Sequence, residues 1–328
     1  MKHVTGAFCP DNGRIYFVGG DYGGQPWVSS YRQETWSLDV AERMANPRNP
    51  NAGWRLEYPY AGFGGNSVQP KHPDYVGWQW DAMLHRFWMI PGVMDITTDN
   101  PPNETPARAS DANFVHDEVM WFDPFAPPPR RWSRAGVDAG IAYTDSWFSW
   151  LDPVKRTISR IGLGPKMQVL DIATSPPSWR VPVNLPDNSR GRKPSIWKDY
   201  VAIDLSGRCV YTIDPIDALF IRIDMDSGAF SERAPPPGPL ETPRAANHTH
   251  IVFNSRHRVV EYLNLNDGRL YVYQPSENRW RVAAVDAPNG RKLQARMAVY
   301  DPVNDWSMWA GGVDVPNPDL LFYRHRRP

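Results

Sequence analysis

The histidines and carboxylates are the side chains of this 328-residue chain whose spacing could support chemistry. In His248-Thr249-His250 two imidazoles fall on the same side of an extended segment, because alternate residues of a strand share a face. A metal site built from side chains needs three or four ligands, and His116 with Asp117 are the residues that could complete the pair. The pattern favours ordinary polar loop residues, and we expect no metal and no other cofactor.

Acidic residues could also supply oxygen ligands for calcium. The candidates are Asp95, Asp99, Asp111, Asp117 and Glu118. They lack the fixed spacing of an EF-hand loop, and the chain has no serine nucleophile elbow, no phosphate-binding loop and no Cys-x-x-Cys pair. Paired carboxylates for glycoside hydrolysis leave no local signature, because the fold brings them together. An enzyme is therefore the third hypothesis for this chain.

Aromatic side chains are the better indication of function. Six of them are expected on or at the root of long loops: Tyr22, Trp27, Tyr31, Trp78, Trp147 and Trp197. Such residues stack on sugar rings or anchor protein interfaces. For Trp78 and Trp147, at the start of expected strands, packing is the simpler interpretation. For Trp27 and Tyr31, in a glycine-flanked stretch, packing and binding both stay open.

The charge pattern argues against some partners. The formal net charge is zero and the pI is about 7.1, so we expect no bulk attraction to nucleic acid or to an anionic membrane. Arg190, Arg192 and Lys193 form a small basic cluster, for which a solvated loop is the simpler interpretation. No apolar run of 18 residues and no signal peptide is found, so we expect a soluble protein in the cytoplasm or a virion. Cys9 and Cys209 are expected as buried free thiols.

These residues must be positioned by a repeat that runs along the whole chain. Its first copy spans Asp11 to Gly20, where an Asp-Asn-Gly turn opens an apolar strand and a glycine doublet closes it. Asp301 to Gly312 repeats this pattern. Six positions anchor such turns: Cys9, Asp81, Asp152, Asp204, Asn254 and Asp301. The residue ten positions further on is a strand-ending or turn residue each time, and a period of about 50 residues with strand content indicates a β-propeller.

Each hairpin is followed by a looser one, whose outer strand begins with an aromatic residue. The clearest cases are Phe122-Asp123-Pro124 before Trp132, and Tyr273-Gln274-Pro275 before Trp280. With its glycine doublets, tyrosine-type strands and tryptophans, the chain resembles the kelch-repeat family of β-propellers. The resemblance covers the whole length and depends on spacing more than on motif. It implies one all-β domain, a six-bladed kelch-like propeller with blades near 4–58, 76–134, 147–183, 199–234, 249–285 and 295–328.

Galactose-oxidase-like enzymes share this fold and carry a copper site with a cysteine cross-linked to a tyrosine. Neither Cys9 nor Cys209 is expected on a long loop, so the resemblance carries no copper site to this chain.

The predicted topology separates long loops from short turns. Strands alternate in direction within a blade, so the connections after the second and fourth strands emerge on one face. The long connections belong almost entirely to this group, whereas the turns after the first strand have about four residues. We therefore expect a contact face there. Its candidate residues are Tyr22, Trp27, Tyr31, Arg32, Asp95, Asp99, His116, Arg192, Trp197 and His248.

The last blade is expected to have only three strands. After its third strand only Arg324 to Pro328 remains, and Met1 to His3 is too short to act as an outer strand. An edge with unpaired backbone groups would result, which could accept a strand from another chain unless the charged tail shields it. This predicted subunit edge consists of Leu320, Leu321, Phe322 and Tyr323.

Kelch-like propellers resemble rigid platforms that capture a partner protein. The resemblance therefore implies a non-catalytic interaction or assembly subunit in a homo- or hetero-oligomer, and bacteriophage tail hubs or nozzles are one use of the architecture. A carbohydrate-binding, lectin-like propeller is the alternative. A galactose-oxidase-like or glycan-processing enzyme comes third.

Overall fold

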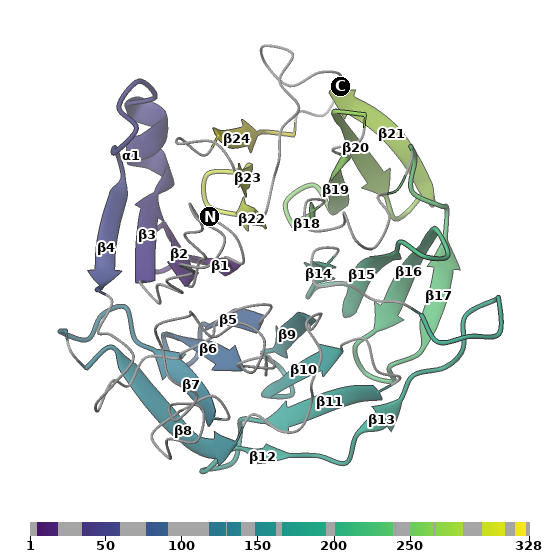
Figure 1. The fold of residues 1–328 in the computed structure, drawn as a ribbon, viewed down its shortest axis with the longest axis horizontal. Coiled ribbons are helices and arrows are strands. Elements are labelled where there is room, and N and C mark those ends of the chain that lie inside the picture. The colour runs from purple at the N-terminus through teal and green to yellow at the C-terminus, as the bar shows by residue number, and fades with distance from the viewer. Residues whose placement is uncertain are drawn as a thin grey trace, which may run out of the picture. The chain divides into compact units, whose positions relative to one another are not determined.

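The computed structural model is built almost entirely of antiparallel β-sheets (Figure 1). It describes residues 5–18, 35–59, 77–90, 118–128, 130–138, 148–161, 166–194, 201–238, 240, 250–264, 267–284, 297–311 and 319–325. These residues form six sheets, in each of which neighbouring strands follow the order of the chain, as in a propeller blade. The predicted fold class, a six-bladed β-propeller, is confirmed.

The first compact unit comprises Met1–Arg160 and Val169–Val181. Blade 1 contains β1 (Thr5–Cys9), β2 (Arg14–Val18), β3 (Thr35–Asp39) and β4 (Trp54–Tyr58), with the short helix α1 (Val40–Ala45) between β3 and β4. Blade 2 contains β5 (Gly77–Asp81), β6 (Arg86–Ile90), β7 (Glu118–Phe122) and β8 (Trp132–Asp138). The first strands of neighbouring blades, β1 with β5 and β5 with β9 (Phe148–Asp152), lie beside one another.

Blade 3 continues from β9 through β10 (Thr157–Ile161) and β11 (Lys166–Asp171). Its outer strand is broken into β12 (Ser178–Trp179) and β13 (Val183–Asn184), and both pieces pair with β11. The fourth strand of this sheet is therefore present in two short parts.

The second compact unit comprises Ile161–Gln168 and Pro182–Pro328. Blade 4 contains β14 (Val201–Asp204), β15 (Cys209–Asp214), β16 (Leu219–Asp224) and β17 (Phe230–Arg233). Blade 5 contains β18 (His250–Asn254), β19 (Val259–Asn264), β20 (Arg269–Gln274) and β21 (Arg279–Ala284). Blade 6 contains β22 (Met297–Asp301), β23 (Trp306–Gly311) and β24 (Asp319–Tyr323). The first strands β14, β18 and β22 again lie beside one another in this order.

The six turns that follow the first strands explain the repeat in the sequence. In five of them the anchoring side chain accepts hydrogen bonds from backbone N–H groups two or three residues further on; Oδ1 of Asp301, for example, accepts from Val303 at 2.9 Å and from Asn304 at 3.0 Å. The fourth residue after every anchor has a left-handed backbone. These six residues are Gly13, His85, Arg156, Arg208, Arg258 and Asp305, with φ between 47° and 70°. Five of the six are not glycine, although L-residues disfavour this conformation.

Aromatic residues fill the core of the first unit. Trp78 is 2% exposed and stacks on Phe87 with ring centroids 4.6 Å apart, while Trp132 closes the cluster 5.6 Å from Trp78. The packing interpretation of Trp78 is therefore confirmed. The predicted buried free thiols, Cys9 and Cys209, are also confirmed, and burial raises the pKa of Cys9 to about 11.

Candidate interaction surfaces

Most of the predicted contact residues lie outside the part of the chain that the structure describes. These are Tyr22, Trp27, Tyr31, Arg32, Asp95, Asp99, His116, Trp197 and His248. Arg192 and the predicted edge, Leu320 to Tyr323, are described. The geometry of the candidate surfaces therefore comes from these residues and from charged groups that the sequence pattern did not single out.

Arg192 is tied to a buried carboxylate in the turn between β15 and β16. Its Nε donates to Oδ2 of Asp217 at 2.7 Å, and its Nη2 contacts the other oxygen of the same carboxylate. The side chain of Asp217 is only 1% exposed, whereas that of Arg192 is 54% exposed. Asn188 donates from Nδ2 to Asp217 at 2.7 Å as well. The guanidinium thus serves first to neutralise a buried charge.

The segment 185–194, here called the Asn188 loop, is fixed by several such contacts. Oδ1 of Asn188 accepts from the backbone N–H groups of Arg190 and Arg192, and Ser189 donates to Glu232 of β17 from both its N–H and its hydroxyl. The connection into blade 4 therefore meets the turn after the second strand of that blade. This is the face that the alternation of strand directions predicts for both connections.

Charged pairs link neighbouring blades at the turns after the first strands. Arg156 of blade 3 bonds Asp81 of blade 2, and His85 of blade 2 contacts Asp11 of blade 1. Burial works to raise the pKa of Asp81, but the hydrogen bonds from Arg156 and from the indole of Trp88 outweigh it and hold the pKa below its ordinary value. Side-chain contacts thus brace these turns from blade to blade.

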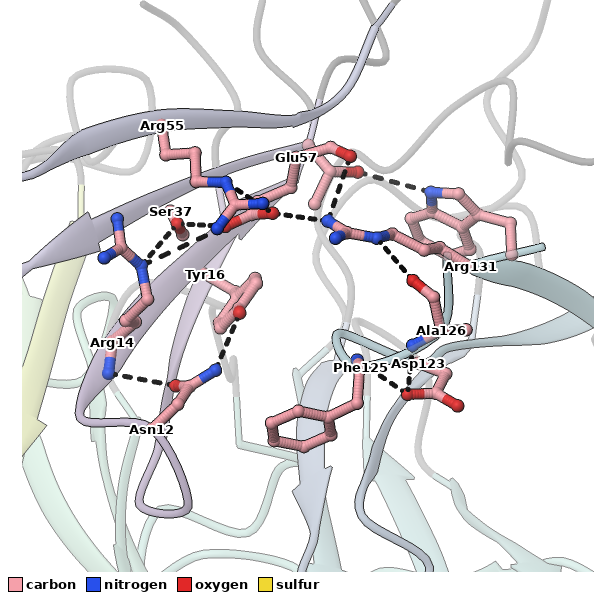
Figure 2. A network of polar contacts seen from close by, with 12 residues as sticks. Asn12, Arg14, Tyr16, Ser37, Arg55, Glu57, Asp123, Phe125, Ala126 and Arg131 are labelled. Atoms are coloured by element: carbon pink, nitrogen blue, oxygen red, sulfur yellow. Dashed lines mark hydrogen bonds and ion pairs between the residues drawn. The ribbon is translucent and has the colours of Figure 1, made fainter. Parts of the chain in front are cut away.

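Figure 2 shows a second link between blades 1 and 2, centred on Glu57 of β4. The side chain of Glu57 is 2% exposed, and its Oε1 accepts from the hydroxyl of Ser37 at 2.6 Å. Arg131, the residue before β8, contacts Oε2 of Glu57 and donates from Nε to the carbonyl of Ala126 at 2.9 Å. Arg14 reaches the same centre, donating from Nε to Ser37 at 2.8 Å. The buried carboxylate of Glu57 is therefore paired with a cation and hydrogen-bonded, as a buried charge requires.

Glu261 of β19 is buried without such compensation. It is fully excluded from solvent, its Oε1 accepts from Nδ2 of Asn254 at 2.9 Å, and its Oε2 has no hydrogen-bond partner. Burial, with a smaller contribution from the charge of Asp305, raises the pKa of Glu261 to about 7. The Ser307 hydroxyl, which is near the carboxylate but outside hydrogen-bond geometry, and the hydrogen bond from Asn254 oppose the shift. The sequence signal was an acidic residue at an inward position of an apolar strand.

A histidine–carboxylate pair lies near this group. Nε2 of His257 is 3.1 Å from Oδ2 of Asp305, whose Oδ1 accepts from the hydroxyl of Tyr300 at 2.9 Å. The buried hydroxyl of Ser307 makes no hydrogen bond to His257, so no nucleophile is paired with the imidazole here. Within the described ranges, no group of three or more His, Cys, Asp or Glu side chains is arranged to hold a metal ion.

The predicted subunit edge is formed by β24. Its inner edge pairs with β23 from Ser307 opposite Tyr323 to Gly311 opposite Asp319. No strand in the described part of the chain pairs with its outer edge, so the sixth sheet has three strands there. Leu321 and Tyr323 pack, only partly buried, against the small core of blades 5 and 6.

A scan against protein-family models gives no match for this chain, and a search of curated proteins gives none either. The class of protein is therefore defined by the fold, a six-bladed β-propeller. No helix among the described residues is long and apolar enough to cross a membrane.

Proposed function

We propose that this propeller is a non-catalytic subunit that binds another protein chain in an assembly. The observation that carries the proposal is the outer edge of β24, which no described strand covers. Exposed strand edges present a row of backbone donors and acceptors, and adding a strand to such an edge is a common mode of protein recognition.

Contacts that hold neighbouring blades and loops together elsewhere in the chain support this function. Buried ion pairs link blades 1, 2 and 3, and the Asn188 loop is fixed to blade 4 by Asp217 and Glu232. A preorganised scaffold binds a partner with little loss of conformational entropy. A kelch-type relationship and a place in a bacteriophage tail are the narrowest forms of this proposal. The kelch-type relationship rests on the glycine doublets at residues 19–20 and 311–312 of the sequence. The place in a phage tail rests on analogy with other proteins that use this fold.

The proposal is tested by hydrogen exchange at Leu320 to Tyr323, followed together with the mass of the protein in solution over a range of concentrations. The amides of β24 that point away from β23 are the ones that report on the outer edge. Two results support the proposal: protection of these amides that disappears as oligomers dissociate, and their fast exchange in a monomer, which leaves the edge available. Full protection of these amides in a monomer at every concentration would overturn it, because the edge would then be covered by the chain itself.

A further inference from the structure

The fourth strands of the other five blades share a feature that blade 6 lacks among the described residues. Each has an aromatic residue as its first or second residue, opposite a residue near the end of the third strand. The five pairs are Trp54 with Leu38, Trp132 with Phe122, Trp179 with Leu170, Phe230 with Ile223 and Trp280 with Tyr273. In the sequence, Arg or Ser follows the aromatic residue every time.

These aromatic residues cover the third strand and, in two blades, the junction with the preceding blade. Trp132 lies 5.1 Å from the ring of Phe122 and donates from its indole to the hydroxyl of Thr35 in blade 1 at 3.3 Å. Trp280 lies 4.9 Å from Phe220 of blade 4 and donates to the carbonyl of Ala234 at 2.9 Å. One aromatic side chain at this position therefore seals the space between two sheets.

Tyr323 occupies the corresponding position of β24. It faces Ser307, the sixth residue after the anchor Asp301, just as Phe122 faces Phe87 in blade 2 and Tyr273 faces Val260 in blade 5. Burial differs sharply between Tyr323 and its counterparts. The five counterparts, Leu38, Phe122, Leu170, Ile223 and Tyr273, are at most 1% exposed, whereas Tyr323 is only partly buried. The ring of His325 lies beside Tyr323, with ring centroids 6.2 Å apart, but no aromatic side chain of a fourth strand covers Tyr323 among the described residues.

We infer that β24 receives an antiparallel strand from a partner protein, with a Trp or Phe opposite Tyr323 and an Arg or Ser immediately after it. This inference rests on the proposed function and names the chemistry of the partner. The aromatic side chain would bury the exposed part of Tyr323 against the core that contains Leu270 and Trp309.

A second copy of this chain does not fit this description through β24 itself. When two β24 strands pair antiparallel over their full length, Asp319 of one lies opposite Tyr323 of the other, since the strand runs from residue 319 to 323. A carboxylate is then placed where the five complete blades have an aromatic ring. The register therefore disfavours a dimer through two β24 strands and favours a strand of different sequence.

The test uses two synthetic peptides that differ at one position. One copies the outer strand of blade 5, residues 279–284 of this sequence, and the other replaces its Trp by Ala. We expect the Trp peptide to bind the intact protein about tenfold more tightly and to protect Leu320 to Tyr323 from hydrogen exchange. The variant Tyr323→Ser should abolish this preference, because the apolar surface opposite the aromatic side chain is lost. The matched control Phe322→Ser should keep it, because Phe322 is opposite Met308 and so lies on the other face of the sheet. Thermal unfolding of both variants establishes that they are folded.

The outcomes separate the inference from the proposed function. If the two peptides bind with equal affinity and both protect β24, a strand does pair with β24 but needs no aromatic residue opposite Tyr323. This result would overturn the inference and leave the proposed function standing. Protection that appears without peptide as the protein dimerises would assign the edge to a second copy and overturn the inference alone. Fast exchange at β24 with no binding of either peptide would also overturn only the inference. Full protection in a peptide-free monomer would overturn both.

Discussion

Arg156 donates two hydrogen bonds to the carboxylate of Asp81, from Nη1 to Oδ1 at 2.7 Å and from Nη2 to Oδ2 at 2.8 Å, while its own backbone is left-handed with φ of 53°. Asp81 is the turn anchor of blade 2, and Arg156 is the last turn residue of blade 3. A backbone conformation that suits glycine is thus occupied by a side chain that neutralises a buried carboxylate of the neighbouring blade. The ion pair offsets the conformational cost.

Replacing Arg156 by glycine should therefore destabilise the protein, although glycine suits the backbone. The substitution relieves a left-handed conformation worth about 1 kcal/mol, but it leaves the 1% exposed carboxylate of Asp81 without its charged partner, which costs about 3–5 kcal/mol. We expect a net loss of about 2–4 kcal/mol in the free energy of unfolding. Urea denaturation measures it.

Arg258 provides the matched control at the same position of blade 5. Its φ is 56°, but its side chain is 64% exposed and its Nη2 lies 3.9 Å from the carboxylate of Asp204. Oδ1 of Asp204 keeps its hydrogen bonds from Ser206 and Gly207 in any case. Arg258→Gly should thus stabilise the protein by up to about 1 kcal/mol. The same sign of change in both variants would refute the proposed role of the Arg156 ion pair.

The Glu57–Arg131 pair should show strong coupling in a double-mutant cycle. Arg131→Met leaves the carboxylate of Glu57 buried, and Glu57→Leu leaves the guanidinium of Arg131 buried at 8% exposure. Each single change should cost about 3–5 kcal/mol, and the double variant should cost much less than their sum. Arg55 serves as the control: its side chain is 62% exposed and lies 3.5 Å from Glu57, so Arg55→Met should cost under about 1 kcal/mol. Additive single changes would show that the pair is not coupled.

Asp217 should hold the Asn188 loop against blade 4. In Asp217→Asn the side chain keeps an oxygen for the amide of Asn188 but loses the ion pair with Arg192. We expect faster hydrogen exchange at Gly191, whose N–H donates to the carbonyl of Asn188 at 2.9 Å. Arg190→Ala is the control, because Nε of Arg190 is 3.8 Å from Asp217 and its side chain is 56% exposed. Equal exchange in all three proteins would mean that Asp217 does not hold the loop.

Local turn chemistry explains why the repeat could be predicted from the sequence. An Asp or Asn side chain caps its own turn, as Asp301 does, so the anchor residues mark strand ends without any tertiary information. The left-handed Arg156 could not be predicted this way, because its partner Asp81 belongs to another blade and lies 75 residues away in the sequence. At this position a long-range ion pair overrides the local preference for glycine.

Buried charges were the second feature that the sequence did not reveal. Glu57 and Glu261 both lie in strands, where alternation suggests an inward or outward direction but gives no partner. Only the fold brings Arg131 of blade 2 to Glu57 and leaves Oε2 of Glu261 without a partner. For the candidate surfaces, the sequence predicted the β24 edge, whereas the basic residue Arg192 belongs to a structural ion pair with Asp217.

The buried carboxyl group of Glu261 should make stability fall as the pH rises towards neutrality. Its pKa in the folded protein is about 7, above its ordinary value of 4.5, so between these values the folded state holds a proton that the unfolded state has released. Below pH 4.5 the carboxyl group is protonated in both states and does not lower the free energy of unfolding. Between pH 4.5 and pH 7 the free energy of unfolding declines. Above pH 7 the loss is constant at about 3 kcal/mol, since each unit of pKa shift corresponds to ~1.4 kcal/mol.

Glu261→Gln should remove this dependence, because its amide stays neutral, can accept from Asn254 and can donate to the unpartnered hydroxyl of Ser307. We expect the variant to match the natural protein near pH 4.5 and to be more stable by about 3 kcal/mol at pH 8.5. Urea denaturation of both proteins at the two pH values measures the difference, in which the contributions of groups common to both proteins cancel. A stability difference that is the same at both pH values would show that Glu261 is ionised in the folded protein across the whole range.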